Sequence, residues 1–171
     1  MRLKKGWSTH IPMLLKYAQI TNGPILELGA GLHSTPLLHW LCAESNRKLI
    51  TYESNLTWFK YAKEFQSRNH SIRLAENWDE IDFIAPLPTA NKKSNKRWSV
   101  VFIDHESERR AIDTIRLKNH ADYIILHDTN DVSVYNYDEV WKHFKYVHHW
   151  TYCIPNTSVV SNFKKLNKLS K

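Results

Sequence analysis

Residues 24–36 read Pro-Ile-Leu-Glu-Leu-Gly-Ala-Gly-Leu-His-Ser-Thr-Pro, and this stretch decides the fold. It opens with a short apolar run that glycines end, and an apolar pattern with helical spacing follows to about residue 42. The pattern predicts a strand, a sharp turn and a helix. Gly29 and Gly31 allow the backbone to turn sharply and to approach a ligand. We expect Ser34 or Thr35 to cap a helix whose free N–H groups favour an anion.

Strand and helix patterns alternate along the rest of the chain. Short apolar runs predict strands at residues 48–53, 71–75, 99–104 and 122–127. Apolar residues at helical spacing predict helices at residues 11–20, with Ser8 as the cap, and at 56–65, 106–118 and 138–144. A turn separates two extended segments that should pair antiparallel, residues 146–152 and 158–163. This order predicts a Rossmann-like, doubly wound α/β fold, with a mostly parallel seven-stranded sheet, helices on both faces and a C-terminal antiparallel hairpin.

We expect a single domain over residues 1–171, because domains seldom divide below about 250 residues. It would comprise an N-terminal helical segment (1–22), a Rossmann-like core (23–163) and a basic tail (164–171). Hydrophobic residues make up 42% of the chain, which is too much for a disordered protein. The apolar runs are far shorter than the roughly 20 residues that span a bilayer, and no secretory signal pattern is present. We therefore expect a cytoplasmic protein with no membrane segment.

The formal net charge of +7 raises the question of nucleic-acid binding. Eleven basic residues lie in three short stretches without acidic residues, namely Arg2, Lys4 and Lys5; Lys92, Lys93, Lys96 and Arg97; and Lys164, Lys165, Lys168 and Lys171. The remainder of the chain is net acidic, with 13 basic against 17 acidic residues. We interpret the stretches as solvated chain ends and a solvated loop. Nucleic-acid binding stays an alternative that would need these residues clustered on one face.

Polar residues follow the predicted strands, and ligands of open parallel sheets bind beyond the carboxyl ends of the strands. The segment Glu27-Leu-Gly-Ala-Gly31 resembles motif I of class I S-adenosylmethionine-dependent methyltransferases, in which an acidic residue precedes G-x-G. The resemblance implies that Glu27 accepts from the cofactor ammonium and that Glu53 binds the ribose. It also implies that Asn77 bonds the exocyclic amine and that Trp78 covers the adenine ring. The predicted S-adenosylmethionine-binding residues are Glu27, Gly29, Ala30, Gly31, Ser34, Thr35, Glu53, Ser54, Asn77, Trp78 and Asp104.

A dinucleotide site is the nearest rival. Glu53 lies 22 residues after Gly31, and an acidic residue about 20 residues on binds ribose hydroxyls in either family. However, Ser34 replaces the third glycine of G-x-G-x-x-G, and the chain has no room for the substrate domain that a dehydrogenase usually adds. An NAD-dependent oxidoreductase is therefore the third hypothesis. The second is a non-catalytic cofactor-binding relative that binds a partner or nucleic acid through the basic stretches.

Residues 101–128 resemble small methyltransferase families whose fourth strand ends in Ile-Asp and whose fifth ends in His-Asp. They also resemble the catechol O-methyltransferase group, in which two carboxylates and an amide at these strand ends hold a magnesium ion. Asp104 and Asp128 match the carboxylates, but Thr129 stands at the amide position and Ser107 at the position of the lysine base. We therefore favour a metal-independent reaction. Mg²⁺ at Asp104 and Asp128 stays the alternative.

Methyl transfer from a sulfonium is an in-line displacement, which needs alignment, a dry site and a deprotonated acceptor. An imidazole with an ordinary pKa near 6.5 can remove such a proton at neutral pH, and Asp104 or Asp128 could orient it. We predict His105, His127 and Asp128 as the catalytic residues. The acceptor should be a small molecule with a hydroxyl or amine. By fold analogy, residues 130–137 and the loops near Trp7 and His10 would contact it.

Overall fold

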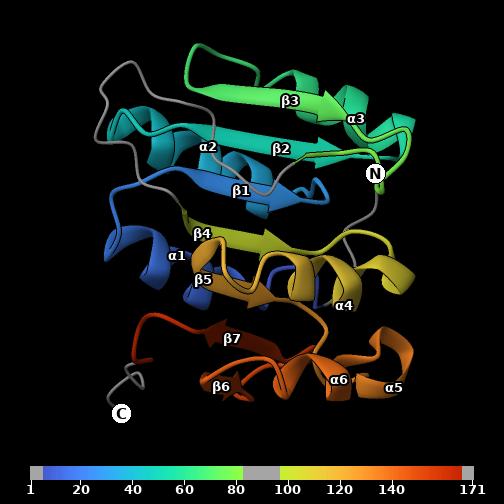
Figure 1. Ribbon diagram of the computed structural model, residues 1–171. Helices are drawn as coiled ribbons and strands as arrows, with labels where there is room; N and C mark the ends of the chain where they lie inside the picture. Colours follow the sequence, from blue (N-terminus) through green and yellow to red (C-terminus); the bar gives the residue numbers. More distant parts are fainter. Residues whose placement is uncertain (1–5, 83–96, 167–171) are drawn as a thin grey trace.

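In the part of the chain that the structure describes, seven strands form one sheet (Figure 1). This computed structural model describes residues 6–82 and 97–166. The strands are β1 (Ile25–Leu28), β2 (Leu49–Glu53), β3 (His70–Leu74), β4 (Trp98–Ile103), β5 (Ala121–Leu126), β6 (Tyr146–Trp150) and β7 (Thr157–Ser161). Their order in the sheet is β3-β2-β1-β4-β5-β7-β6.

The pairing confirms the predicted doubly wound sheet. β1 pairs in parallel with both β2 and β4, while β3 and β5 extend the parallel part on either side. β7 runs antiparallel to β5 and to β6, which is the predicted C-terminal hairpin. The strand order reverses between β1 and β4, and the carboxyl ends of strands at such a switch point are where ligands bind in open α/β sheets.

Helices cover both faces of the sheet (Figure 1). They are α1 (Ile11–Gln19), α2 (Ser34–Glu44), α3 (Leu56–Lys63), α4 (Ser107–Arg116), α5 (Val132–Tyr135) and α6 (Tyr137–Trp141). Successive strand residues point to opposite faces, so the central strands contribute to two cores. Ile25 and Phe102 pack with α1 and α2 in one core, and Leu26 and Val101 pack with α4 and α6 in the other. α3 packs against β2 and β3.

The predicted cap of the first helix is wrong. The N-cap of α1 is His10, and no side chain hydrogen-bonds to the helix end there. Ser8 instead uses its backbone carbonyl, which accepts the N–H of Ile11 at 3.1 Å. The other predicted elements agree with the structure to within a few residues, and α5 is an additional short helix before α6.

Most of the predicted basic stretches fall outside the described residues. These are Arg2, Lys4, Lys5, Lys92, Lys93, Lys96, Lys168 and Lys171. Arg97 is described: its Nε lies 2.9 Å from Asp122 Oδ1, and its guanidinium lies 4.1 Å from the ring centre of Phe163. Among the described residues, no helix has the length and apolar character needed to cross a membrane.

Candidate cofactor and acceptor site

Gly29 directly follows β1 and lies beside the carboxyl end of β4. Its φ is 92°, in the region that favours glycine. A Cβ at this position would lie 2.6 Å from backbone atoms of Asp104 and His105. The folded backbone therefore requires glycine at position 29 for its own packing, and the predicted approach of a ligand would be a second reason.

Glu27 lies beneath the glycine turn. The predicted caps of α2 are wrong, because His33 is the N-cap and Ser34 and Thr35 are the first residues of the helix. The Thr35 hydroxyl is occupied elsewhere: it accepts the N–H of Gly31 at 3.0 Å and donates to the Glu27 carboxylate at 3.1 Å. Glu27 is completely buried, and burial raises the pKa of its carboxyl to about 7. The structure thus makes Glu27 a support of the turn, and its contact with a cofactor ammonium stays a prediction.

Glu53 holds the same turn from the end of β2. Its two carboxylate oxygens accept the N–H groups of Ala30 and Asn55, each at 2.7 Å. Burial raises the pKa of this carboxyl, although both hydrogen bonds oppose the rise. Glu53 also lines a cavity together with Ser54 and Asp104. Four of the predicted cofactor-binding residues therefore line this cavity, namely Ala30, Glu53, Ser54 and Asp104.

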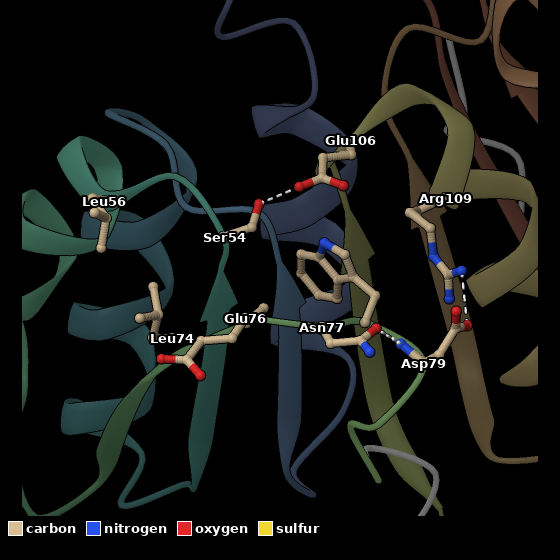
Figure 2. Close-up of a pocket in the computed structure, with 10 residues that line it drawn as sticks. Ser54, Leu56, Leu74, Glu76, Asn77, Asp79, Glu106 and Arg109 are labelled. Atoms are coloured by element: carbon tan, nitrogen blue, oxygen red, sulfur yellow. Dashed lines mark hydrogen bonds and ion pairs between the residues drawn. The ribbon is translucent and has the colours of Figure 1, made fainter.

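Three cavities lined by described residues follow one another along this edge of the sheet. The first has a volume of about 640 Å³ and includes Ser54, Asn77 and Trp78 in its lining (Figure 2). The middle cavity, of about 430 Å³, shares Ser54 with the first and Asp104 with the third. The third, of about 380 Å³, is called the Trp7 cavity here because Trp7 lines its outer part. The shared lining residues make the three cavities neighbours in one row.

The first cavity is lined by the buried indole of Trp78 and by the amide of Asn77, which already makes two hydrogen bonds. Asn77 accepts the N–H of Asp79 at 3.1 Å and donates to Glu80 at 2.9 Å, and Figure 2 shows the first of these bonds. Trp78 is 5% exposed, and its Nε1 has no hydrogen-bond partner within residues 6–82 and 97–166. Its ring centre lies 4.5 Å from that of His105.

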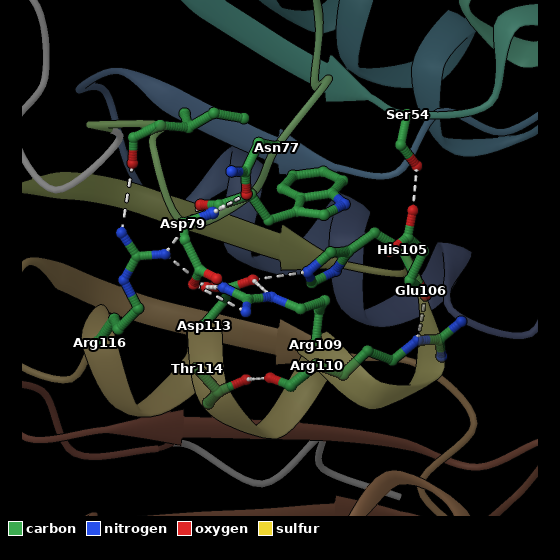
Figure 3. A network of polar contacts seen from close by, with 12 residues as sticks. Ser54, Asn77, Asp79, His105, Glu106, Arg109, Arg110, Asp113, Thr114 and Arg116 are labelled. Atoms are coloured by element: carbon green, nitrogen blue, oxygen red, sulfur yellow. Dashed lines mark hydrogen bonds and ion pairs between the residues drawn. The ribbon is translucent and has the colours of Figure 1, made fainter.

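His105 belongs to a network of charges behind Trp78 (Figure 3). Its side chain is 1% exposed, and its Nε2 lies 2.9 Å from Asp113 of α4. Asp113 also pairs with Arg109 at 3.2 Å and with Arg116 at 2.8 Å. Burial lowers the pKa of His105 despite the nearby carboxylate. His105 contributes to the wall of the middle cavity and is not among the residues that line the Trp7 cavity.

Arg110 of α4 joins the two predicted strand-end carboxylates, and sequence reasoning missed it. Its guanidinium lies 2.8 Å from Asp104 and 2.9 Å from Asp128, and its Nε donates to the carbonyl of His105 at 2.7 Å. A signal was present in the sequence, because an arginine on the buried face of an amphipathic helix needs acidic or carbonyl partners. Asp128 also accepts from Tyr135 at 3.3 Å.

The magnesium alternative does not fit this arrangement. Asp104 and Asp128 each use an oxygen on Arg110, so a cation already compensates the pair. Thr129, at the position of the missing amide ligand, accepts a hydrogen bond from Ser158 at 2.8 Å. The pair therefore lacks the third oxygen ligand of the magnesium site and has one oxygen of each carboxylate engaged, which does not favour Mg²⁺ between Asp104 and Asp128.

His127 lies between Asp104 and the N-terminal segment. Its Nδ1 is 3.2 Å from Asp104 Oδ2, and its Nε2 is 3.0 Å from the hydroxyl of Thr9. Burial favours the neutral ring, but the hydrogen bond and charge of Asp104 outweigh burial and raise the pKa of His127. The adjacent His10 ring is also buried, and burial together with the neighbouring His127 lowers its pKa to about 3. Both histidines line the Trp7 cavity.

The Trp7 cavity agrees in part with the predicted acceptor region. Trp7 and His10 line it, as the fold analogy implied. Residues 130–137 do not appear in its described lining, and Pro155 from the hairpin loop forms part of the wall instead.

Comparison with known proteins supports the fold assignment. No protein-family model matches the sequence, and a search of curated proteins finds no match either. Among solved structures, an O-methyltransferase from Bacillus cereus in complex with SAH is 16% identical, with a TM-score of 0.62 over 94% of this chain and 82% of that chain. The O-methyltransferase TomG from Streptomyces achromogenes in complex with SAM is 13% identical, with a TM-score of 0.63 over 90% of this chain and 80% of that chain. Spermidine synthase from Thermotoga maritima is 15% identical, with a TM-score of 0.61 over 95% of this chain and 61% of that chain.

The sheet order, the hairpin and these similarities assign the chain the fold of class I S-adenosylmethionine-dependent methyltransferases. Spermidine synthase from Thermotoga maritima has a similar fold, so the fold alone does not define an activity.

Proposed function

We propose that this chain is a cytoplasmic S-adenosylmethionine-dependent methyltransferase that acts on a hydroxyl or amine of a small molecule. The observation that carries the proposal is the row of three neighbouring cavities at the carboxyl ends of β1, β2, β4 and β5. A nucleoside fits at one end of such a row and an acceptor at the other, with the glycine turn between them. The similar fold of the solved O-methyltransferases supports this interpretation.

The residues around the first two cavities provide the groups that the cofactor needs. Glu53 would accept the ribose hydroxyls, while Trp78 would cover the adenine ring. Asn77 would have to exchange a bond to Asp79 or Glu80 for the exocyclic amine. When bound, S-adenosylmethionine supplies a methyl group on a positively charged sulfur.

The Trp7 cavity contains the side chain that would remove a proton from the methyl acceptor. His127 faces this cavity, and Asp104 holds its ring through Nδ1. An acceptor hydroxyl or ammonium in place of Thr9 would give its proton to Nε2 of His127. Asp128 would act through Arg110, which it shares with Asp104. His105, which is buried against Trp78, would position the adenine end instead of removing the proton.

The test is calorimetric binding of S-adenosylmethionine, S-adenosylhomocysteine and NAD to the full chain. We expect the first two to bind and NAD to fail. Glu53→Ala should weaken binding of both by about 1 to 3 kcal/mol, because a charged acceptor of hydrogen bonds is lost. Glu64→Ala, at an exposed glutamate, is the matched control. Binding of NAD without S-adenosylmethionine would instead support the oxidoreductase.

A second measurement separates an enzyme from a non-catalytic relative. His127→Ala should bind S-adenosylmethionine like the parent but lose turnover on a panel of hydroxyl and amine acceptors. A parent protein that binds the cofactor and methylates no acceptor on the panel would favour the non-catalytic relative. Equal turnover by the parent and His127→Ala would remove the proposed base.

A further inference from the structure

Three potential metal ligands meet in the Trp7 cavity. His10, Asp104 and His127 each offer an atom, and these atoms lie within 4.8 Å of one another. The three residues come from different parts of the fold, namely the start of α1 and the ends of β4 and β5. Two imidazole nitrogens and a carboxylate oxygen are a donor set that first-row transition metals bind well.

The hydrogen bonds around His127 leave a place for a cation beside Asp104. The Thr9 hydroxyl has one proton, which it donates to the carbonyl of Gly6 at 3.1 Å. Its oxygen therefore suits a His127 tautomer that carries its proton on Nε2, which lies 3.0 Å away. With that proton on Nε2, the lone pair of Nδ1 faces Asp104 Oδ2 at 3.2 Å. In the metal-free protein a proton on Nδ1 joins these two atoms, as proton removal by Nε2 requires, and a metal ion bound by both atoms would replace that proton.

His10 gives an independent indication of a ligand. It is 2% exposed, and neither of its ring nitrogens has a hydrogen-bond partner within residues 6–82 and 97–166. Its ring packs 4.7 Å from that of Phe102 and 4.7 Å from that of His127, measured between ring centres. A buried nitrogen without a partner is unfavourable, and coordination of a metal ion would satisfy its lone pair.

We propose that His10, Asp104 and His127 bind a divalent first-row transition-metal ion, for which Zn²⁺ is the test ion. Ligand atoms around a tetrahedral zinc ion lie about 3.4 Å apart, so His127 and Asp104 are already spaced for it. His10 completes the set by a side-chain movement. The bond from Nε2 to Thr9 is the outer contact that fixes the metal-binding tautomer of His127. The Trp7 cavity gives an entry path and room for water as a further ligand.

This site differs from the rejected Asp104–Asp128 pair in donor set and in metal. Asp104 keeps Oδ1 on Arg110 and offers Oδ2, while Asp128 takes no part. Imidazole ligands favour transition metals over Mg²⁺. An ion on Nδ1 leaves His127 without a lone pair, because Nε2 carries the remaining proton. Metal binding and the proposed proton removal therefore exclude each other, and this consequence alone rests on the proposed function.

The test is a titration of the metal-free full chain with Zn²⁺ by calorimetry and with Co²⁺ by visible absorption, without cofactor or acceptor. We expect one equivalent of each ion to bind and Mg²⁺ not to bind. His10→Phe keeps an aromatic ring against Phe102 and should weaken Zn²⁺ binding at least about 100-fold, since losing a ligand exceeds the usual effect of losing an outer contact. Asp104→Asn is the second variant. His143→Ala, at an exposed histidine, is the control and should bind like the parent.

Two results would overturn the proposed metal site. One is a parent protein that binds no equivalent of Zn²⁺, and the other is Zn²⁺ affinity that neither His10→Phe nor Asp104→Asn changes. Circular dichroism of each variant shows whether it is folded. S-adenosylmethionine binding by the same preparation separates the two proposals. A protein that binds the cofactor but no Zn²⁺ lacks the metal site only. A protein that binds Zn²⁺ but no cofactor keeps the metal site and loses the proposed function.

Discussion

Glu27 is a carboxylate with no exposed surface, and hydroxyl groups are its partners. Thr51 donates to it at 2.6 Å and Thr35 at 3.1 Å. Neutral donors compensate a buried charge only in part, which is why the pKa of Glu27 rises to about 7. In the folded protein the protonated form of Glu27 therefore predominates below about pH 7.

The raised pKa of Glu27 gives a pH dependence of stability with a definite sign. The folded-state value of about 7 lies above the ordinary 4.5, so its favourable contribution is complete below about pH 4.5 and is lost as the pH rises through about 7. Relative to Glu27→Gln, which stays neutral, the parent should lose about 3 kcal/mol of unfolding free energy across this range. Urea unfolding at pH 5, 6, 7 and 8 measures the difference. Parallel stability curves for the two proteins would contradict it, and the exposed Glu64→Gln serves as control.

Gly29 and Gly31 offer a matched pair of substitutions. Gly29→Ala would place Cβ 2.6 Å from backbone atoms of Asp104 and His105 at a φ of 92°, so it should cost about 1 to 3 kcal/mol and displace the end of β4. Gly31→Ala would meet only a side-chain atom, the hydroxyl oxygen of Ser34 at 3.0 Å, which needs a smaller shift than the backbone contact at Gly29. Denaturation curves and cofactor affinity should both be affected more by the first change. Equal effects would show that the backbone contact is not limiting.

At the scale of elements, α4 organises the site from one side of the sheet. Its buried face carries Arg110, which lines the Trp7 cavity, and Asp113, which pairs with His105. A single helix therefore sets the charge balance of the strand-end aspartates through Arg110 and holds His105, the neighbour of Trp78, through Asp113. Figure 3 shows the pair of Asp113 and His105.

Replacement of Arg110, the cation of α4, should show how strongly the unpaired carboxylates of Asp104 and Asp128 destabilise the fold. Arg110→Met leaves Asp104 and Asp128 without a guanidinium, and we expect a loss of about 3 kcal/mol in unfolding free energy. Adding Asp128→Asn to this variant should recover part of the loss, because one charge is removed. Lys142→Met, at an exposed ion pair, should leave stability unchanged. A double variant less stable than Arg110→Met alone would show that the aspartates do not repel each other.

The elements could be predicted because their signals are local. The apolar runs of β4 and β5 and the glycines after β1 depend on neighbouring residues alone. The predicted caps at Ser8 and at Ser34 or Thr35 were wrong, because a local pattern does not show which partner a hydroxyl finds in the folded protein: Thr35 binds Glu27 of β1. Arg110 and His10 acquire their roles only when α4 and α1 pack beside the strand ends, and no spacing in the sequence encodes that distance.

At the scale of the whole molecule, the net charge of +7 does not by itself make a nucleic-acid surface. Arg97 illustrates this, since it pairs with Asp122 and covers Phe163. We expect no measurable binding of duplex DNA at low salt. Fluorescence anisotropy at two salt concentrations checks this. Binding whose logarithmic affinity falls by about 0.9 per neutralised phosphate would reinstate the nucleic-acid alternative.

The reversed direction of β7 brings the loop at residues 151–156 to the same edge as the strand ends. Pro155 there lines the Trp7 cavity, and the backbone of Asn156 is tied to the loop after β5 by bonds of 3.0 Å to Thr129 and Asn130. The opposite end of the cavity row is formed by residues far earlier in the chain. Under the proposed function, a directed-evolution library confined to this loop would therefore alter the acceptor end of the cavity row and leave the residues proposed to bind the nucleoside unchanged.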